Sequence, residues 1–192
     1  TVTATGSQTE VGESANSYSI DWGTTDSKNY AISEELGTLT VTTNATAAVK
    51  LIAADAEKVY DGTPLTKADG VTWEGLPAGF TVEASSTGSQ TNAGESANVV
   101  NDGYVIYDAN NVDQTANFTN VTKEPGTLTV TKAPVTIKTG SAEKEYDGTA
   151  LTKDEASISG LVNGETATVT ATGSQTEVGE SANSYSIDWG TT

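Results

Sequence analysis

The chain has 192 residues, a formal net charge of −17 at pH 7 and an apolar content of only 35%. It has no cysteine, methionine, histidine or arginine, which excludes disulfides, thiolate or imidazole catalysis, and zinc or haem ligation by such side chains. The negative charge argues against binding to nucleic acid or to anionic membrane surfaces, because both need clustered lysine or arginine. No apolar run reaches the roughly 18 residues that a membrane-spanning helix requires.

The first and last 25 residues of the chain are the same. The segment Thr1–Thr25, TVTATGSQTEVGESANSYSIDWGTT, returns letter for letter as 168–192. A diverged third copy of its TGSQT and GESAN markers lies at 87–91 and 94–98. Self-similarity at a fixed spacing is the signature of tandem repeats, so we interpret the chain as a window onto an array.

Two further markers define the repeat. AEKVYDGTPLTK at 56–67 returns as AEKEYDGTALTK at 142–153, an offset of 86 residues, and GTLTV at 37–41 returns at 126–130, an offset of 89. We therefore predict a repeat of about 85 residues, in alternating versions that form a super-repeat of 167. The predicted segments are the second part of one repeat at 1–47, a complete repeat at 48–132 and the first part of the next at 133–192.

Short segments that alternate apolar and polar residues follow one another along the chain, as half-buried strands do. They lie at 17–22, 37–42, 49–52, 126–131, 135–138 and 185–189. The dipeptides Asp61-Gly62, Asp102-Gly103 and Asp147-Gly148 predict tight turns in which glycine adopts a positive φ. Single helical turns are expected at 112–117 and 153–157.

This pattern predicts an all-β fold. We expect tandem small β-sandwich modules of the immunoglobulin-like kind in an elongated array, with a β-grasp-like module as the alternative. The linker at 131–134 ends in Pro134 and is very short, which favours a semi-rigid connection between modules.

The Lys-x-Tyr-Asp-Gly-Thr sequence at 58–63 and 144–149 is followed by TGSQT, a GES-type turn and, after the first copy, GTLTVT. This ordered set resembles the YDG and MBG-type tandem repeats of bacterial cell-surface adhesins of Gram-positive type, over essentially the whole chain. The resemblance implies an extracellular protein attached to the bacterial cell wall, whose repeats hold a distal adhesive region away from the cell. It leaves open whether the repeats form a stalk or polymerise into a fibre.

The Tyr-Asp-Gly-Thr turn has two interpretations. Its tyrosine could stack on a sugar whose hydroxyls donate to the carboxylate, or the tyrosine could close the end of a core while the aspartate bonds its own turn. We favour the structural interpretation and predict no catalytic, cofactor-binding or metal-binding residue and no enzyme activity. The turn residues are Tyr60, Asp61, Gly62, Thr63, Tyr146, Asp147, Gly148 and Thr149.

Two other chemistries are considered, and for each the alternative is that the residues lie in solvent-exposed loops. Calcium would need six to eight oxygen ligands, and the richest clusters match no EF-hand spacing. An isopeptide cross-link would join Lys58 or Lys144 to Asn29 or Asn117, but the signatures of that reaction are missing. The calcium candidates are Asp102, Asp108, Asn110, Asn111 and Asp113, with a poorer set at Asp21 and Asp26.

The leading functional hypothesis is a structural spacer whose partners are neighbouring repeats of the same or another chain. The alternative is binding of host glycans or mucin-like ligands through exposed aromatic residues such as Trp73, Phe80 or Tyr107. A third is self-association through incomplete sheets with open edges. We expect only the middle repeat to be self-sufficient, and the outer parts to be completed either by each other, within or between chains, or by more of a continuous polymer.

Overall fold

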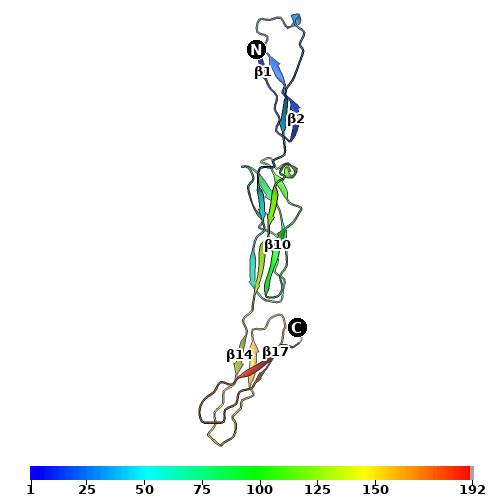
Figure 1. The fold of residues 1–192 in the computed structure, drawn as a ribbon. Helices are drawn as coiled ribbons and strands as arrows, with labels where there is room; N and C mark the ends of the chain where they lie inside the picture. The colour runs from blue at the N-terminus through cyan, green and yellow to red at the C-terminus, as the bar shows by residue number, and fades with distance from the viewer. Residues whose placement is uncertain (191–192) are drawn as a thin grey trace. The chain divides into compact units, whose positions relative to one another are not determined.

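The computed structural model describes residues 1–190, which form short β-strands joined by loops (Figure 1). The helical segments among these residues are two single 3-10 turns, η1 (Ser27–Asn29) and η2 (Thr115–Asn117). The predicted all-β class is therefore confirmed, as is the helical turn within 112–117. The helical turn predicted at 153–157 is wrong, because that segment runs extended into the strand β15 (Ala156–Ser159). Thr191 and Thr192, the last residues of the duplicated segment, lie outside the described residues.

The chain divides into two compact units, each assembled from segments that alternate along the sequence. Unit 1 contains residues 1–54, 69–86 and 99–125, and unit 2 contains residues 55–68, 87–98 and 126–192. The repeat boundaries after residues 47 and 132 come from sequence periodicity and stay predictions.

Unit 1 contains four small sheets. The strands β1 and β3 pair with each other, as do β2 and β4, and β8 and β11, while β5 lies between β12 and β7. The pairing of β5 with β12 is parallel, and its pairing with β7 is antiparallel. The strands are β1 (Val2–Ala4), β2 (Gly12–Ala15), β3 (Tyr18–Ile20), β4 (Thr38–Val41), β5 (Val49–Ile52), β7 (Thr72–Glu74), β8 (Thr81–Glu83), β11 (Val105–Tyr107) and β12 (Val121–Glu124).

The core of unit 1 forms around β5. Val49 and Leu51 point to one face of this strand and are fully buried, as the alternation in the sequence predicts. Each side chain of this size contributes roughly 1.5–3 kcal/mol when it is removed from water. Phe80 packs edge-on against Phe118 with the ring centroids 5.2 Å apart. The other buried members of this core are Ala53, Val100 and Ile106.

Unit 2 contains a four-stranded sheet in the order β6-β13-β10-β9 and two strand pairs, β14 with β15 and β16 with β17. Leu128 and Val130 on β13 are buried, while Thr127, which precedes Leu128 on the same strand, is exposed. The alternation predicted for GTLTVT is thus confirmed in this copy. The strands are β6 (Ala56–Val59), β9 (Ser86–Thr87), β10 (Gly94–Val100), β13 (Gly126–Thr131), β14 (Thr136–Thr139), β16 (Thr168–Ala171) and β17 (Tyr185–Asp188). Ser86 of β9 and the last two residues of β10 belong to unit 1.

Equivalent segments of the repeat pair in the same register. In the middle repeat Leu51 lies opposite Trp73, and at the equivalent positions of the last repeat Ile137 lies opposite Ile158. A glycine follows the second strand in both copies, with φ of +83° at Gly75 and +95° at Gly160. A Cβ atom at either glycine would lie 2.0 Å or 2.6 Å from a backbone oxygen of the neighbouring segment, so glycine is required there.

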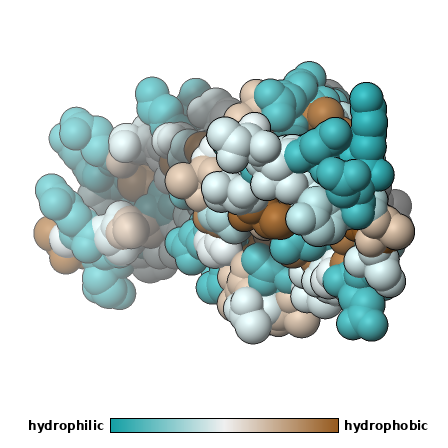
Figure 2. All heavy atoms as spheres, turned by 90° about the horizontal axis from the view of Figure 1, so that it is seen from above, coloured by the Kyte–Doolittle hydropathy of each residue, from teal (hydrophilic) through white to brown (hydrophobic). Residues whose placement is uncertain are grey.

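The surface is predominantly polar. In the view of Figure 2, hydrophobic residues appear as small patches separated by hydrophilic ones. The exposed large hydrophobic residues belong mainly to the two outer segments, where Val178 is 85% exposed and Val2 is 66% exposed. None of the helical segments within residues 1–190 has the length and hydrophobicity that a membrane-crossing helix needs.

Candidate functional site

The markers that define the repeat in the sequence meet in one sheet. The AEK strand β6 runs parallel to the GTLTVT strand β13, with Ala56 opposite Leu128. The GESAN strand β10 runs antiparallel along the other edge of β13, with Ser96 opposite Leu128. The TGSQT segment pairs with the loop that follows β6, through an antiparallel bridge between Leu65 and Gln90. We call the strands β6, β13, β10 and β9 the marker sheet.

The Tyr-Asp-Gly-Thr turn follows β6 and is closed by its own polar groups. Lys58 Nζ donates to Asp61 Oδ1 at 2.6 Å and to Thr63 Oγ1 at 2.7 Å, and also to the Thr63 carbonyl. Asp61 Oδ1 accepts in addition from the Thr63 amide at 2.9 Å, while Gly62 adopts a φ of +79°. All three hydrogens of the ammonium group are therefore used within the turn.

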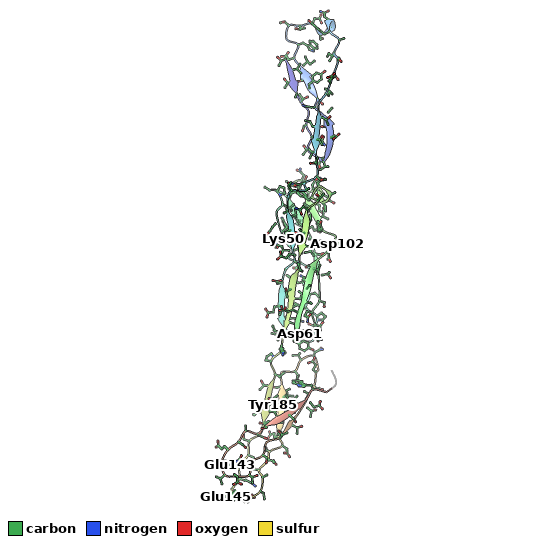
Figure 3. All side chains as sticks on the ribbon, in the orientation of Figure 1. Lys50, Asp61, Asp102, Glu143, Glu145 and Tyr185 are labelled. Atoms are coloured by element: carbon green, nitrogen blue, oxygen red, sulfur yellow. The ribbon has the colours of Figure 1, made fainter. Side chains whose placement is uncertain are left out.

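The second copy of this turn repeats the contacts among the lysine, aspartate and threonine side chains. Lys144 Nζ donates to Asp147 Oδ1 and Thr149 Oγ1, both at 2.7 Å, and the Thr149 amide donates to Asp147 at 2.9 Å. Gly148 has a φ of +75°. The neighbouring lysine, together with the threonine hydrogen bonds, holds the pKa of the Asp61 and Asp147 carboxyls well below their usual range. Figure 3 labels Asp61 beyond the end of the marker sheet.

Tyr146 does not close a core, so that part of the structural interpretation is wrong for the second copy. Tyr146 is 62% exposed. Tyr60 is half-buried and lines a groove of about 370 Å³ in unit 2, together with Leu161 and Trp189. Its hydroxyl donates to Glu165, and this hydrogen bond raises the pKa of the Tyr60 phenol. The turns are held by the lysine and aspartate, not by the aromatic ring.

A repeated glutamine and a repeated asparagine hold the loops around the marker sheet, and sequence reasoning missed both. The glutamine of TGSQT donates to the carbonyl two residues on in all three copies, from Gln8, Gln90 and Gln175, at 2.7 Å each time. Asn98 is fully buried and donates to the Lys67 carbonyl at 2.8 Å. Their only signal in the sequence was repetition inside the TGSQT and GESAN markers.

Asn183 repeats the role of Asn98 in the last repeat. Its Nδ2 donates to the carbonyls of Lys153 at 2.8 Å and Gly140 at 3.0 Å, and its Oδ1 accepts from the Gly173 amide at 3.1 Å. One side chain therefore ties three separate loops together. The hydrogen bond from the asparagine amide to the lysine carbonyl is thus present in both copies.

A groove of about 570 Å³ lies in the last repeat, between the segments equivalent to β6 and β10, which flank β13 in the middle repeat. One wall contains Ala142–Glu145, the equivalent of β6, and the other contains Gly179–Ala182, the equivalent of the first part of β10. Neither segment is a strand, and all eight residues are exposed. Figure 3 places Glu143 and Glu145 in the loops of this repeat, away from Tyr185 on β17. We call this cavity the strand groove.

The identical residues at the other end of the chain are paired. Gly12–Ala15 form β2 and pair antiparallel with β4, with Ser14 opposite Leu39. This is the register of β10 and β13, in which Ser96 lies opposite Leu128. The same four letters, GESA, are thus a strand at 12–15, where a GTLTV segment lies beside them, and an exposed loop at 179–182.

The acidic residues considered for calcium act as turn caps or ion-pair partners. Asp108 accepts from the amides of Asn110 and Val112, both at 2.9 Å, and Asp113 accepts from the Thr115 amide at 2.9 Å. The bond from the Val112 amide lowers the pKa of Asp108, and those from the Thr115 side chain and amide lower the pKa of Asp113. Within residues 1–190, no three acidic side chains are placed to hold a metal ion together.

Asp102 forms an ion pair with Lys123 that the sequence did not predict. Lys123 Nζ lies 2.5 Å from Asp102, 3.0 Å from the Asn101 carbonyl and 5.3 Å from the centre of the Tyr104 ring. The ion pair lowers the pKa of Asp102. The prediction of a positive φ in the Asp102-Gly103 turn is wrong, since Gly103 has no positive φ.

The aromatic residues proposed for glycan contact differ in exposure. Phe80 packs against the core of unit 1, and Tyr107 is half-buried, so neither is an exposed platform. Trp73 on β7 is 38% exposed. Among the residues considered for an isopeptide bond, both lysines are held in their turns and Asn117 donates to Gln114.

No protein-family model, curated protein or solved structure matches this chain.

Proposed function

We propose that this chain is a set of structural repeats from a bacterial cell-surface or extracellular protein, acting as a spacer or fibre that holds an adhesive region away from the cell. The observation that carries the proposal is the shared register. The β2–β4 pair repeats the pairing of β10 with β13, and β14–β15 repeats that of β5 with β7. A length set by the number of equivalent modules is the property that a spacer needs.

The polar turns fit this role. Each Lys-Asp-Thr turn satisfies its own donors and acceptors, as a module that must fold in every copy requires. The fold we propose is a tandem array of small sandwich modules related to the immunoglobulin type. The β-grasp alternative is less favoured, because such folds pack a helix on the sheet and the described residues have only single 3-10 turns. The net charge of −17 favours a soluble, self-repelling surface.

Small-angle X-ray scattering of the 192-residue chain tests the spacer. A single compact domain of this length has a radius of gyration of about 16 Å. We expect a value well above this, and a value near 16 Å would overturn the proposal. The alternative, binding of host glycans, is tested on a glycan array with the Trp73→Ala variant as control. Reproducible binding that this variant loses would replace the pure spacer with a binding module.

A further inference from the structure

The middle repeat and the last repeat meet through a turn and a loop that both belong to unit 2. The Tyr60 hydroxyl of the first Tyr-Asp-Gly-Thr turn donates to the Glu165 carboxylate, a charge-assisted hydrogen bond. In the same turn Gly62 lies against the Asn163 side chain, because a Cβ atom at Gly62 would lie 2.4 Å from the Asn163 Cβ and Cγ atoms. These four residues form a contact that we call the repeat joint.

The loop of the repeat joint has an equivalent with the same backbone turn in the middle repeat. The two loops read GLPAGF at 75–80 and GLVNGE at 160–165. In each loop the amide of the sixth residue donates to the carbonyl of the third, at 3.3 Å in the first loop and 3.0 Å in the second. The fifth residue of each is a glycine, with φ of +89° and +74°. The two versions therefore differ in their side chains and not in their turn.

Two side chains of the loop determine what it can contact. Where the last repeat has Asn163 and Glu165, the middle repeat has Ala78 and Phe80. The Phe80 ring packs edge-on against Phe118 and has no acceptor for a tyrosine hydroxyl. Ala78 lacks the amide group with which Asn163 covers Gly62 in the repeat joint. The GLPAGF loop therefore cannot make the contacts of the GLVNGE loop.

We propose that Asn163 and Glu165 select the repeat that docks on the Tyr60 turn, and that a repeat with the GLPAGF loop does not dock there. The partner of this surface is a repeat of the other version, recognised through its amide and carboxylate side chains. Specificity of this kind is a difference between two affinities, and here the two loops supply the difference. The inference goes beyond the spacer function and does not rest on it, because it needs only two neighbouring repeats.

The contact before the middle repeat uses other residues, as selective contacts require. There, within unit 1, the Gln114 side-chain amide donates to the Glu10 carboxylate at 3.3 Å. The linker residue Asn44 pairs with 117–119 through its backbone, at 2.7 Å and 3.2 Å. In the middle repeat the place of Glu10 in the TGSQTE sequence is taken by Asn92. Each version thus has its own polar side chains at the position where it meets the following repeat.

Two glycines provide a matched test of the repeat joint. Gly62 and Gly148 lie in the same kind of turn, with φ of +79° and +75°, so alanine strains both backbones alike. A Cβ atom at Gly62 meets Asn163, whereas a Cβ atom at Gly148 has nothing within 4 Å. Gly62→Ala should therefore open the repeat joint, and Gly148→Ala controls for the strain within the turn.

Spin labels on the two sides of the repeat joint measure the effect. The natural chain has no cysteine, so exposed Glu95→Cys on β10 and Thr170→Cys on β16 define the two labelled positions. Double electron–electron resonance on the 192-residue chain gives the distribution of distances between the labels. We expect one narrow distribution in this background. Gly62→Ala should raise the undocked fraction about fivefold, because it separates the groups of a hydrogen bond to a charged partner, and Gly148→Ala should not.

A second set of variants leaves both glycines in place. Asn163→Ala/Glu165→Phe gives the loop the two side chains of the middle repeat, and should broaden the distribution as Gly62→Ala does. Tyr60→Phe removes only the hydroxyl and should broaden it less. Tyr146→Phe is its control, because the Tyr146 side chain is 62% exposed and takes no part in the repeat joint. Circular dichroism of each variant separates an opened joint from an unfolded repeat.

The outcomes are distinct. Broadening by Gly62→Ala and by the loop exchange, but by neither control, supports the proposal. A broad distribution in the labelled background, or equal effects of Gly62→Ala and Gly148→Ala, would overturn the repeat joint. Broadening by Gly62→Ala but not by the loop exchange would overturn selection by Asn163 and Glu165.

The loop exchange and Tyr60→Phe decide alone if circular dichroism shows that the Gly62→Ala chain is unfolded. A distribution unchanged by both would then overturn the proposal. The distances across one joint are measured separately from the radius of gyration of the chain, so failure of the spacer and failure of the repeat joint are distinguishable.

Discussion

Lys58 and Asp61 form an ion pair of 2.6 Å within a turn that also contains the bonded Thr63, and Lys144 and Asp147 repeat it at 2.7 Å. The aspartate pKa is lowered in the folded chain, so this contribution to stability is present above the ordinary aspartate pKa of about 3.9. It is lost as the pH falls below that value toward the folded pKa.

We therefore expect the Asp61→Asn/Asp147→Asn variant to unfold at a lower temperature than the natural chain at pH 7. The difference should shrink as the pH is lowered from 4 toward 2, because the aspartates of the unfolded chain then take up protons while those of the folded chain stay charged. Thermal unfolding followed by circular dichroism across this range checks the prediction. A difference that stays constant with pH would mean that the charge of these aspartates does not stabilise the fold. Asp188→Asn, at a carboxylate that caps the Gly190 amide without a lysine, is the control.

The buried asparagine gives a second prediction. Asn98→Ala removes the donor to the Lys67 carbonyl from a fully buried position. Loss of such a hydrogen bond costs about 1–3 kcal/mol, which should appear as a lower free energy of unfolding in urea. Asn92→Ala is the matched control, since Asn92 lies in an exposed loop and only its backbone carbonyl accepts from Gln90. Equal effects of the two substitutions would contradict a stabilising role for the buried Asn98 side chain.

The duplicated segments give a third prediction, about local stability. The amides of Gly12 and Ser14 lie in β2, while those of Gly179 and Ser181 lie in the exposed loop. We expect slower hydrogen exchange in the first copy than in the second at low protein concentration. NMR with segmental ¹⁵N labelling makes the measurement, because peptide fragments of the two copies have the same mass.

Leu39→Asp should abolish the protection of the first copy, since it places a charge opposite Ser14 in the strand pair. Equal protection of both copies in the natural chain would show that GESA forms a strand without a GTLTV partner.

The core gives a fourth prediction. Leu51→Ala in β5 should lower the free energy of unfolding by about 2–5 kcal/mol, because the residue is fully buried. Ile137→Ala at the equivalent place in β14 should cost at most about 2 kcal/mol, because that residue is only half-buried. Denaturant unfolding of both variants makes the comparison. A larger effect at Ile137 would contradict the difference in burial between the two repeats.

Much of the fold could be predicted from alternation and repetition. The strand at 126–131, the buried face of β5 and the positive φ of Gly62 and Gly148 follow from local sequence, and the structure confirms them. These features depend on residues close in the chain, which is where sequence patterns are informative.

The remaining features depend on what lies beside a segment. Identical GESA letters are a strand in one copy and a loop in the other, because only a neighbouring GTLTV strand can satisfy their backbone groups. In the same way, Tyr60 and Tyr146 share a motif but differ in burial. Phe80 was expected on the surface, but its ring packs against Phe118, which is distant in the sequence. These contacts join residues that are tens of positions apart, so no local sequence pattern predicts them.

The parallel pairing of β5 with β12 and of β6 with β13 determines how a repeat meets mechanical force. The earlier strand of each pair enters at one end and the later strand leaves at the other, so tension along the chain acts parallel to both strands. Their inter-strand hydrogen bonds are then loaded in shear and share the load, whereas a hairpin pulled from one end opens its bonds one after another. Single-molecule stretching should therefore give a higher unfolding force for the middle repeat than for the antiparallel β2–β4 pair.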